Sequence, residues 1–65
     1  MEIKRLKNCM ELKCVTYEEM AQLCGINYHV FEERMEQKSE FTLGEIEIIA
    51  NRLGMNEIDV NIIFF

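Results

Sequence analysis

The side chains best suited to chemistry are few and lie apart along the chain. His29 is the only histidine, and the three cysteines are Cys9, Cys14 and Cys24. A catalytic nucleophile needs a base and a third, orienting group, and a zinc site needs paired ligands such as CxxC; neither pattern occurs. No glycine-rich loop that could hold a phosphate is present. We therefore expect no enzyme, no metal and no cofactor, and we interpret the cysteines as free, partly buried thiols.

A second group of polar residues has a spacing that suits recognition. Glu32, Glu33 and Glu36 follow Tyr28 and His29 within two helical turns, and few apolar residues lie between them. If this segment is helical, most of its surface is exposed to solvent. A carboxylate can accept a hydrogen bond from the amino group of cytosine, and tyrosine and histidine can contact bases or phosphates. The glutamates therefore fit three roles: reading bases, binding a basic protein surface, or forming a solvated face.

The length and composition limit what can position these residues. A chain of 65 residues forms one domain, 1–65, and buries only roughly 60% of its surface on folding. Hydrophobic residues make up 49% and charged residues 29%, as in an ordinary globular protein. No segment approaches the roughly 20 apolar residues of a membrane span, and the first residues lack the apolar run of a signal peptide. We expect a cytoplasmic protein without membrane association.

Apolar residues recur at helical spacing in separate segments, and the predicted core-facing stripes include Leu6, Met20, Leu23, Phe31, Leu43 and Ile49. The predicted helices cover about residues 2–13, 17–24, 28–37 and 43–53, and a last short turn follows at 57–59. Their predicted N-caps are Thr16, Asn27, Thr42 and Asn56. Thr16 and Thr42 are each followed three residues later by a glutamate, which predicts a capping box, and Gly25 and Gly54 are placed to end helices. The predicted fold class is all-α, a bundle of four to five helices with a short apolar C-terminal segment.

Residues 16–31 resemble the DNA-binding motif of a known family. Their sequence, TYEEMAQLCGINYHVF, is similar to the pattern T-x-x-E-L-A-x-x-x-G-I-S-x-x-x-F of the XRE, Cro/lambda-repressor-like helix-turn-helix family. Residues 40–46, the helix end at Leu53 and Gly54, and the terminal Ile-Phe-Phe resemble small phage and mobile-element members. The resemblance covers nearly the whole chain. It implies a lambda-repressor-like bundle with its motif at about 16–36, which binds double-stranded DNA as a homodimer and regulates transcription, typically as a repressor.

The resemblance also implies a set of DNA contacts. The recognition helix would present to the major groove Asn27, Tyr28, His29, Glu32 and Glu33. Tyr17 stands where the family often has a glutamine that contacts a phosphate, and Lys38 lies in the loop that would pass near the DNA backbone.

The charge distribution departs from this family. The net charge is −5, and after residue 13 ten acidic residues face only three basic ones. Recognition helices usually carry basic or amide side chains where this chain has Glu32, Glu33 and Glu36, and Arg34 offsets only one of them. Neutralising phosphates supplies much of the affinity of DNA-binding proteins. The alternative is therefore a protein-binding helix-turn-helix module, such as an antirepressor or a phage inhibitor, whose acidic face binds a basic protein partner.

Residues 60–65 are almost entirely apolar. Five of these six residues are hydrophobic, too many to leave in water on so small a protein. We expect some to pack on the core and the rest to form a short strand or turn that pairs with a second copy across a two-fold axis. The predicted dimerisation residues are Val60, Ile62, Ile63, Phe64 and Phe65. The alternative is that the whole segment covers the core of a monomer.

Overall fold

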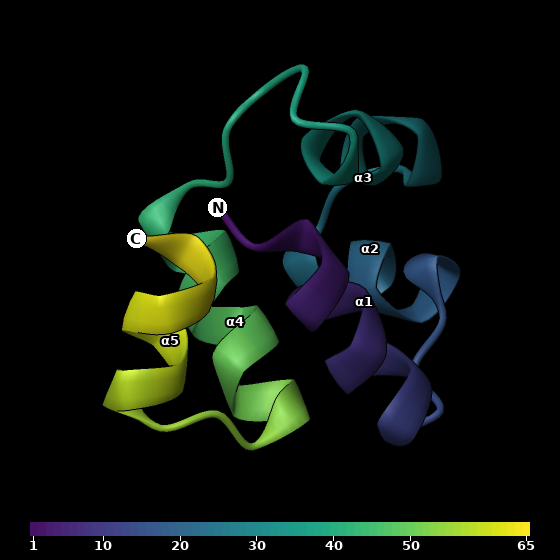
Figure 1. The fold of residues 1–65 in the computed structure, drawn as a ribbon. Helices are drawn as coiled ribbons and strands as arrows, with labels where there is room; N and C mark the ends of the chain where they lie inside the picture. Colours follow the sequence, from purple (N-terminus) through teal and green to yellow (C-terminus); the bar gives the residue numbers. More distant parts are fainter.

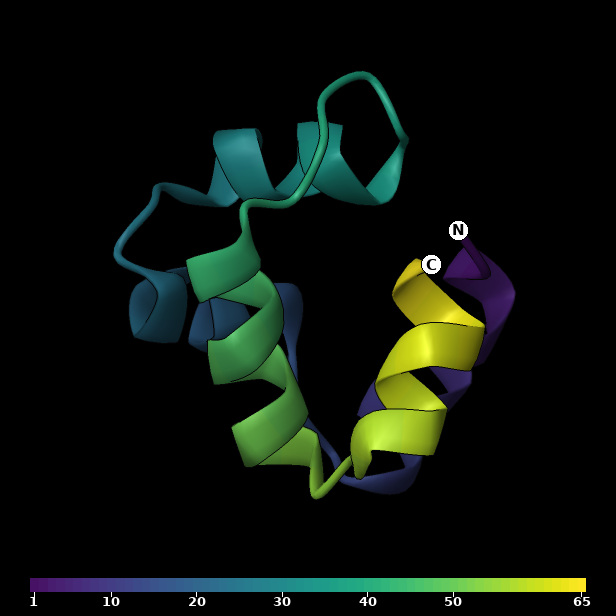
Figure 2. The same cartoon turned by 90° about the vertical axis from the view of Figure 1, so that its left-hand side faces the viewer.

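Five helices and no strand make up the computed structural model, which describes residues 1–65 (Figure 1). The helices are α1 (Ile3–Leu12), α2 (Tyr17–Cys24), α3 (Tyr28–Met35), α4 (Leu43–Leu53) and α5 (Glu57–Phe64). Helix α2 packs on α3 and α4, and α5 packs on α1 and α4. The two ends of the chain lie side by side, where the Glu2 N–H donates to the Ile63 carbonyl at 2.7 Å (Figures 1 and 2). The all-α bundle is confirmed, and none of its helices is long and apolar enough to cross a membrane.

The predicted N-caps are confirmed. In each case the capping side chain accepts a hydrogen bond of 2.8–3.1 Å from the N–H three residues later: Thr16, Asn27, Thr42 and Asn56. The capping box at Thr42 is complete, because the Glu45 carboxylate accepts from the Thr42 N–H. The capping box predicted at Thr16 is wrong in its second half. The Glu19 carboxylate instead accepts from Arg52 Nε at 2.8 Å, since that pairing satisfies two charges at once.

Helices α1 to α4 all end in the same way. One residue takes a left-handed conformation, and the next residue's N–H donates to the carbonyl five residues before it, which is the Schellman arrangement. The left-handed residues are Cys14 (φ 55°), Gly25 (φ 73°), Gln37 (φ 61°) and Gly54 (φ 68°). The two glycines confirm the predicted helix ends. Cys14 and Gln37 carry no such signal in the sequence, and α3 therefore stops at Met35, two residues earlier than predicted.

One apolar core joins all five helices. Its wholly buried side chains are Leu6, Met20, Phe31 and Ile49, each placed on a core-facing stripe by the sequence. Leu23 and Leu43, also predicted on such stripes, are exposed. Leu23 precedes Cys24, whose side chain packs against the core. Successive side chains of an α-helix are about 100° apart, so the Leu23 side chain points away from the core. Leu43 is the first residue of α4, and the buried residues of this helix begin at Glu45.

The C-terminal segment differs from the prediction. Residues 57–64 form a full helix, α5, begun by a capping box between Asn56 and Asp59, and not a short turn followed by a strand. Ile63 and Phe64 are buried in the core of the same chain and Val60 is half-buried. Two of the predicted dimerisation residues are therefore core residues, because an α-helix turns part of this apolar run inward. Ile62 and Phe65 stay exposed.

Candidate nucleic-acid interface

Helices α2 and α3 form a compact unit joined by residues 25–27. Gly25 takes the left-handed conformation that lets the chain turn, and the small side chain of Ala21 is buried beneath the junction. Helix α3 packs chiefly on α2 and lies across one end of the bundle, away from the loop between α4 and α5 (Figure 2). Phe31 and Met35 point into the core, and Arg34 pairs with Glu45 of α4, whereas Tyr28 and His29 are exposed and Glu32 and Glu33 are partly exposed.

The start of α3 brings together three of the predicted contact residues. The side-chain oxygen Oδ1 of Asn27 caps the helix by accepting from the Val30 N–H at 2.8 Å, which leaves the N–H groups of the side-chain amide available. Tyr28 and His29 are exposed. His29 Nδ1 lies 3.9 Å from a carboxylate oxygen of Glu32. Amide, hydroxyl and imidazole groups thus share one accessible end of the helix, and together they can donate and accept hydrogen bonds.

The predicted acidic readers lie farther along α3. Glu32 and Glu33 are only half-buried, and Glu36 is exposed just past the end of the helix. The structure therefore places an acidic strip beside the polar group at the helix start. Glu33 has no ion-pair partner within 4 Å, and Glu32 has only His29.

The side chain of Tyr17 is partly buried between α2 and α3 and partly exposed at the surface. Its ring meets Phe31 edge-on with centroids 5.4 Å apart and lies 6.3 Å from Tyr28. Burial raises the pKa of Tyr17, and the nearby Tyr28, Glu32 and Glu36 raise it further. The carboxylates that disfavour a negative charge on this hydroxyl also disfavour a phosphate beside it. Glu32 and Glu36 would therefore repel a phosphate that contacts Tyr17, as the resemblance implies.

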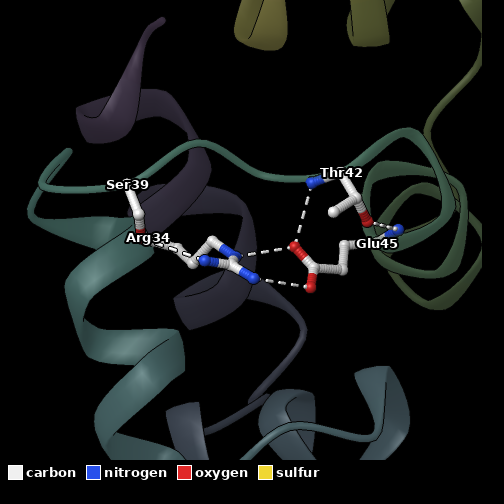
Figure 3. A network of polar contacts seen from close by, with 4 residues as sticks. All are labelled: Arg34, Ser39, Thr42 and Glu45. Carbon is white, nitrogen blue, oxygen red and sulfur yellow. Dashed lines mark hydrogen bonds and ion pairs between the residues drawn. The ribbon is translucent and has the colours of Figure 1, made fainter.

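Arg34, the only cation on α3, points back toward the bundle. Its Nε and Nη2 donate to the two carboxylate oxygens of Glu45 at 2.8 and 3.1 Å, and its Nη1 donates to Ser39 Oγ at 3.0 Å (Figure 3). The same Glu45 carboxylate accepts from the Thr42 N–H at 3.0 Å. Only 17% of the Arg34 side chain and 8% of the Glu45 side chain are exposed. One ion pair therefore joins the end of α3, the following loop and the start of α4.

The electrostatics of this pair fix its charge. The hydrogen bonds from Arg34 hold the pKa of Glu45 below its ordinary value against the opposing effect of burial, and the Thr42 N–H lowers it further. The hydrogen bond to Glu45 raises the pKa of Arg34. The main partner of Arg34 is thus Glu45 on α4, and Glu33 on α3 makes a smaller favourable contribution to the Arg34 charge. The sequence reveals Glu45 as a capping residue but not as this partner, because the two residues are eleven positions apart and meet only across a loop.

The other cations after residue 13 are also paired. Lys38, predicted near the DNA backbone, is exposed with its Nζ 3.3 Å from Glu36, and Arg52 pairs with Glu19. The surface around α3 consequently has no cation free of a carboxylate. No group of three or more histidine, cysteine or acidic side chains is arranged to hold a metal ion.

Comparison with known proteins adds no identification to this geometry: no protein-family model matches the chain, and no curated protein or solved structure is significantly similar to it.

Proposed function

We propose that this protein is a sequence-specific DNA-binding transcriptional regulator of the lambda-repressor-like helix-turn-helix type, acting as a homodimer. The observation that carries the proposal is the α2–turn–α3 unit, whose second helix is uncovered at one end of the bundle. The major groove of B-DNA admits an α-helix, and recognition helices contact base edges through their first residues. In this proposal α3 is the recognition helix.

The exposed start of α3 supplies the contacts to bases. The free amide group of Asn27, the hydroxyl of Tyr28 and the imidazole of His29 present donors and acceptors within one turn. Glu32 and Glu33 follow on the next turn and can accept from the exocyclic amino group of cytosine. This arrangement favours sites in which cytosines lie beside the bases read by the helix start.

Selection from a pool of random duplexes tests the proposal. The protein is incubated with the pool at about 50 and about 200 mM salt, and the retained duplexes are sequenced, since affinity carried by phosphates falls with salt while base preference persists. We expect a palindromic site. His29→Ala should lose preference at defined base pairs, whereas Asn51→Ala, an exposed change on α4, should leave the site unaltered. Failure of the folded protein to retain any duplex would exclude DNA binding.

The acidic strip on α3 favours a second candidate, a module that binds a basic protein surface. Its supporting observation is that Arg34 is paired with Glu45 outside the strip, while Glu32 and Glu33 have no lysine or arginine within 4 Å. The double change of Glu32 and Glu33 to glutamine separates the two functions. It should strengthen duplex binding if the glutamates only repel phosphate, relax the preference for cytosine if they read it, and weaken a complex with a basic partner if that is their target.

A further inference from the structure

The cations of this molecule fall into two groups, paired and unpaired. Arg34 and Arg52 each lie 2.8 Å from a glutamate oxygen, and Lys38 lies 3.3 Å from one. On α1 and at its end, only Arg5 has such a partner, Glu2 at 3.7 Å. The cations with no carboxylate within 4 Å are Lys4, Lys7 and Lys13. Every unpaired cationic side chain therefore belongs to the first segment of the chain.

These three lysines are exposed and close in sequence. Lys4 and Lys7 are three residues apart on α1, so they lie on the same side of the helix, while Leu6 and Met10 occupy its core side. Lys13 follows the last residue of α1 and precedes Thr16, the N-cap of α2, by three residues. Glu11, the single carboxylate within α1, lies four residues after Lys7 and so on the same side of the helix, but it has no cation within 4 Å. Residues 1–13 still carry four lysine or arginine residues against two glutamates, which makes this segment locally basic in a molecule whose net charge is −5.

We propose that Lys4, Lys7 and Lys13 bind the phosphate backbone of duplex DNA, while α3 faces the bases. This inference rests on the proposed DNA-binding function and adds to it the source of its electrostatic affinity. A lysine without a carboxylate partner can neutralise a phosphate and release the counterions condensed there, whereas a paired one must first give up its glutamate. The carboxylates around α3 repel phosphates and the α1 surface attracts them, so the field of the protein turns α1 toward the backbone.

Two double variants of the full chain with equal loss of charge test this assignment. The first, Lys4→Gln with Lys7→Gln, removes two unpaired cations of α1; the second, Lys38→Gln with Arg52→Gln, removes two paired cations outside α1. Binding to a random-sequence duplex is measured by fluorescence anisotropy between about 50 and about 200 mM salt. The first variant should reduce the slope of log K against log salt by about 1.8, or about 0.9 for each phosphate contact. The second should change it by less than half as much. Circular dichroism confirms that both are folded.

Each result decides the assignment. An equal reduction in the two variants would mean that only net charge matters, and a larger reduction in the second would place the phosphate contacts outside α1. Both outcomes overturn the role of α1 and leave DNA binding intact. If the wild type binds the duplex and the first variant has the same slope of log K against log salt, this inference alone is overturned. Absence of wild-type binding at about 50 mM salt overturns the proposed function together with it.

Discussion

At the scale of single residues, the ion pair between Arg34 and Glu45 determines how much of α3 is available for recognition. The guanidinium group is held by two carboxylate oxygens and by Ser39, so it joins the loop after α3 to α4 and does not face outward (Figure 3). A bidentate pair of this kind fixes the relative orientation of the guanidinium and carboxylate groups in addition to attracting them. It fixes the end of α3 against the bundle, and because the partner of Arg34 lies on α4, Glu32 and Glu33 have no lysine or arginine within 4 Å.

Loss of Glu45 should destabilise the fold. Glu45→Gln leaves the mostly buried Arg34 charge without its counterion, and we expect a loss of about 1–3 kcal/mol, less than for a fully buried pair because Arg34 retains some exposure. Urea denaturation followed by circular dichroism measures it. Glu19→Gln breaks the more exposed pair with Arg52, whose side chains are 40% and 38% exposed, and should cost less than about 1 kcal/mol. Equal losses in the two variants would contradict the structural role given to Glu45.

The same carboxylate predicts how stability depends on pH. The pKa of Glu45 is lower in the folded chain than in the unfolded one, so the unfolded state binds the proton more readily and stability falls with falling pH. The contribution is complete above the ordinary carboxyl value of about 4.3 and is lost as the pH falls through the folded value. Urea denaturation of the wild type and of Glu45→Gln at a series of pH values should show their difference shrinking below about 4.3. A difference that stays constant into strong acid would contradict this.

At the scale of elements, the starts of the helices are easier to predict from the sequence than their ends. Thr16, Asn27, Thr42 and Asn56 act within three residues, so the sequence alone locates them. Gln37 follows α3 in a left-handed conformation, which glutamine rarely adopts, so its residue type does not predict the end of the helix. The helical C-terminus was missed because residues 60–65 are apolar on nearly every side and lack the spacing of an amphipathic helix.

The same reasoning explains what could be predicted of the candidate site. Tyr28, His29, Glu32 and Glu33 lie on α3 as their spacing requires, because a helix fixes the relative positions of its own residues. The pairing of Arg34 with Glu45 and of Glu19 with Arg52 depends on how separate helices pack. Local spacing carries no information about such contacts, and they are the ones that decide which charges stay free.

Replacing the left-handed residue after α3 should stabilise the protein. Gln37 has φ 61°, which strains an L-residue but not glycine, so Gln37→Gly should raise the free energy of unfolding by about 0.5–1 kcal/mol after the entropy cost of glycine is counted. The reverse change, Gly25→Ala, imposes the same strain at φ 73° and should lower it. Thermal or urea denaturation measures both. Destabilisation by Gln37→Gly would mean that the left-handed conformation at this position is not maintained in solution.

At the scale of the whole molecule, one apolar strip is left uncovered after the five helices have packed. Ile58 and Ile62 on α5 and Phe65 just after its end are four and three residues apart, so they lie along one side of the helix, and all three are exposed. An uncovered apolar strip on a small protein marks an interface. The proposed homodimer would place two such strips together across a two-fold axis, which requires a surface that complements itself. Ile63 and Phe64 contribute by holding α5 to the core.

Placing a charge on this strip should therefore dissociate the dimer without unfolding the protomer. Ile62→Glu is the informative change, and Leu23→Glu on α2 is its matched control, because the two side chains are 47% and 46% exposed and each change adds one negative charge. In sedimentation velocity over a range of concentrations, the wild type and Leu23→Glu should approach the mass of a dimer as concentration rises, while Ile62→Glu stays a monomer. A wild type that is monomeric throughout, or two variants that behave alike, would remove α5 as the dimer contact. Because a dimer can bind both halves of a palindrome, Ile62→Glu should also weaken binding to the full site much more than binding to a half-site.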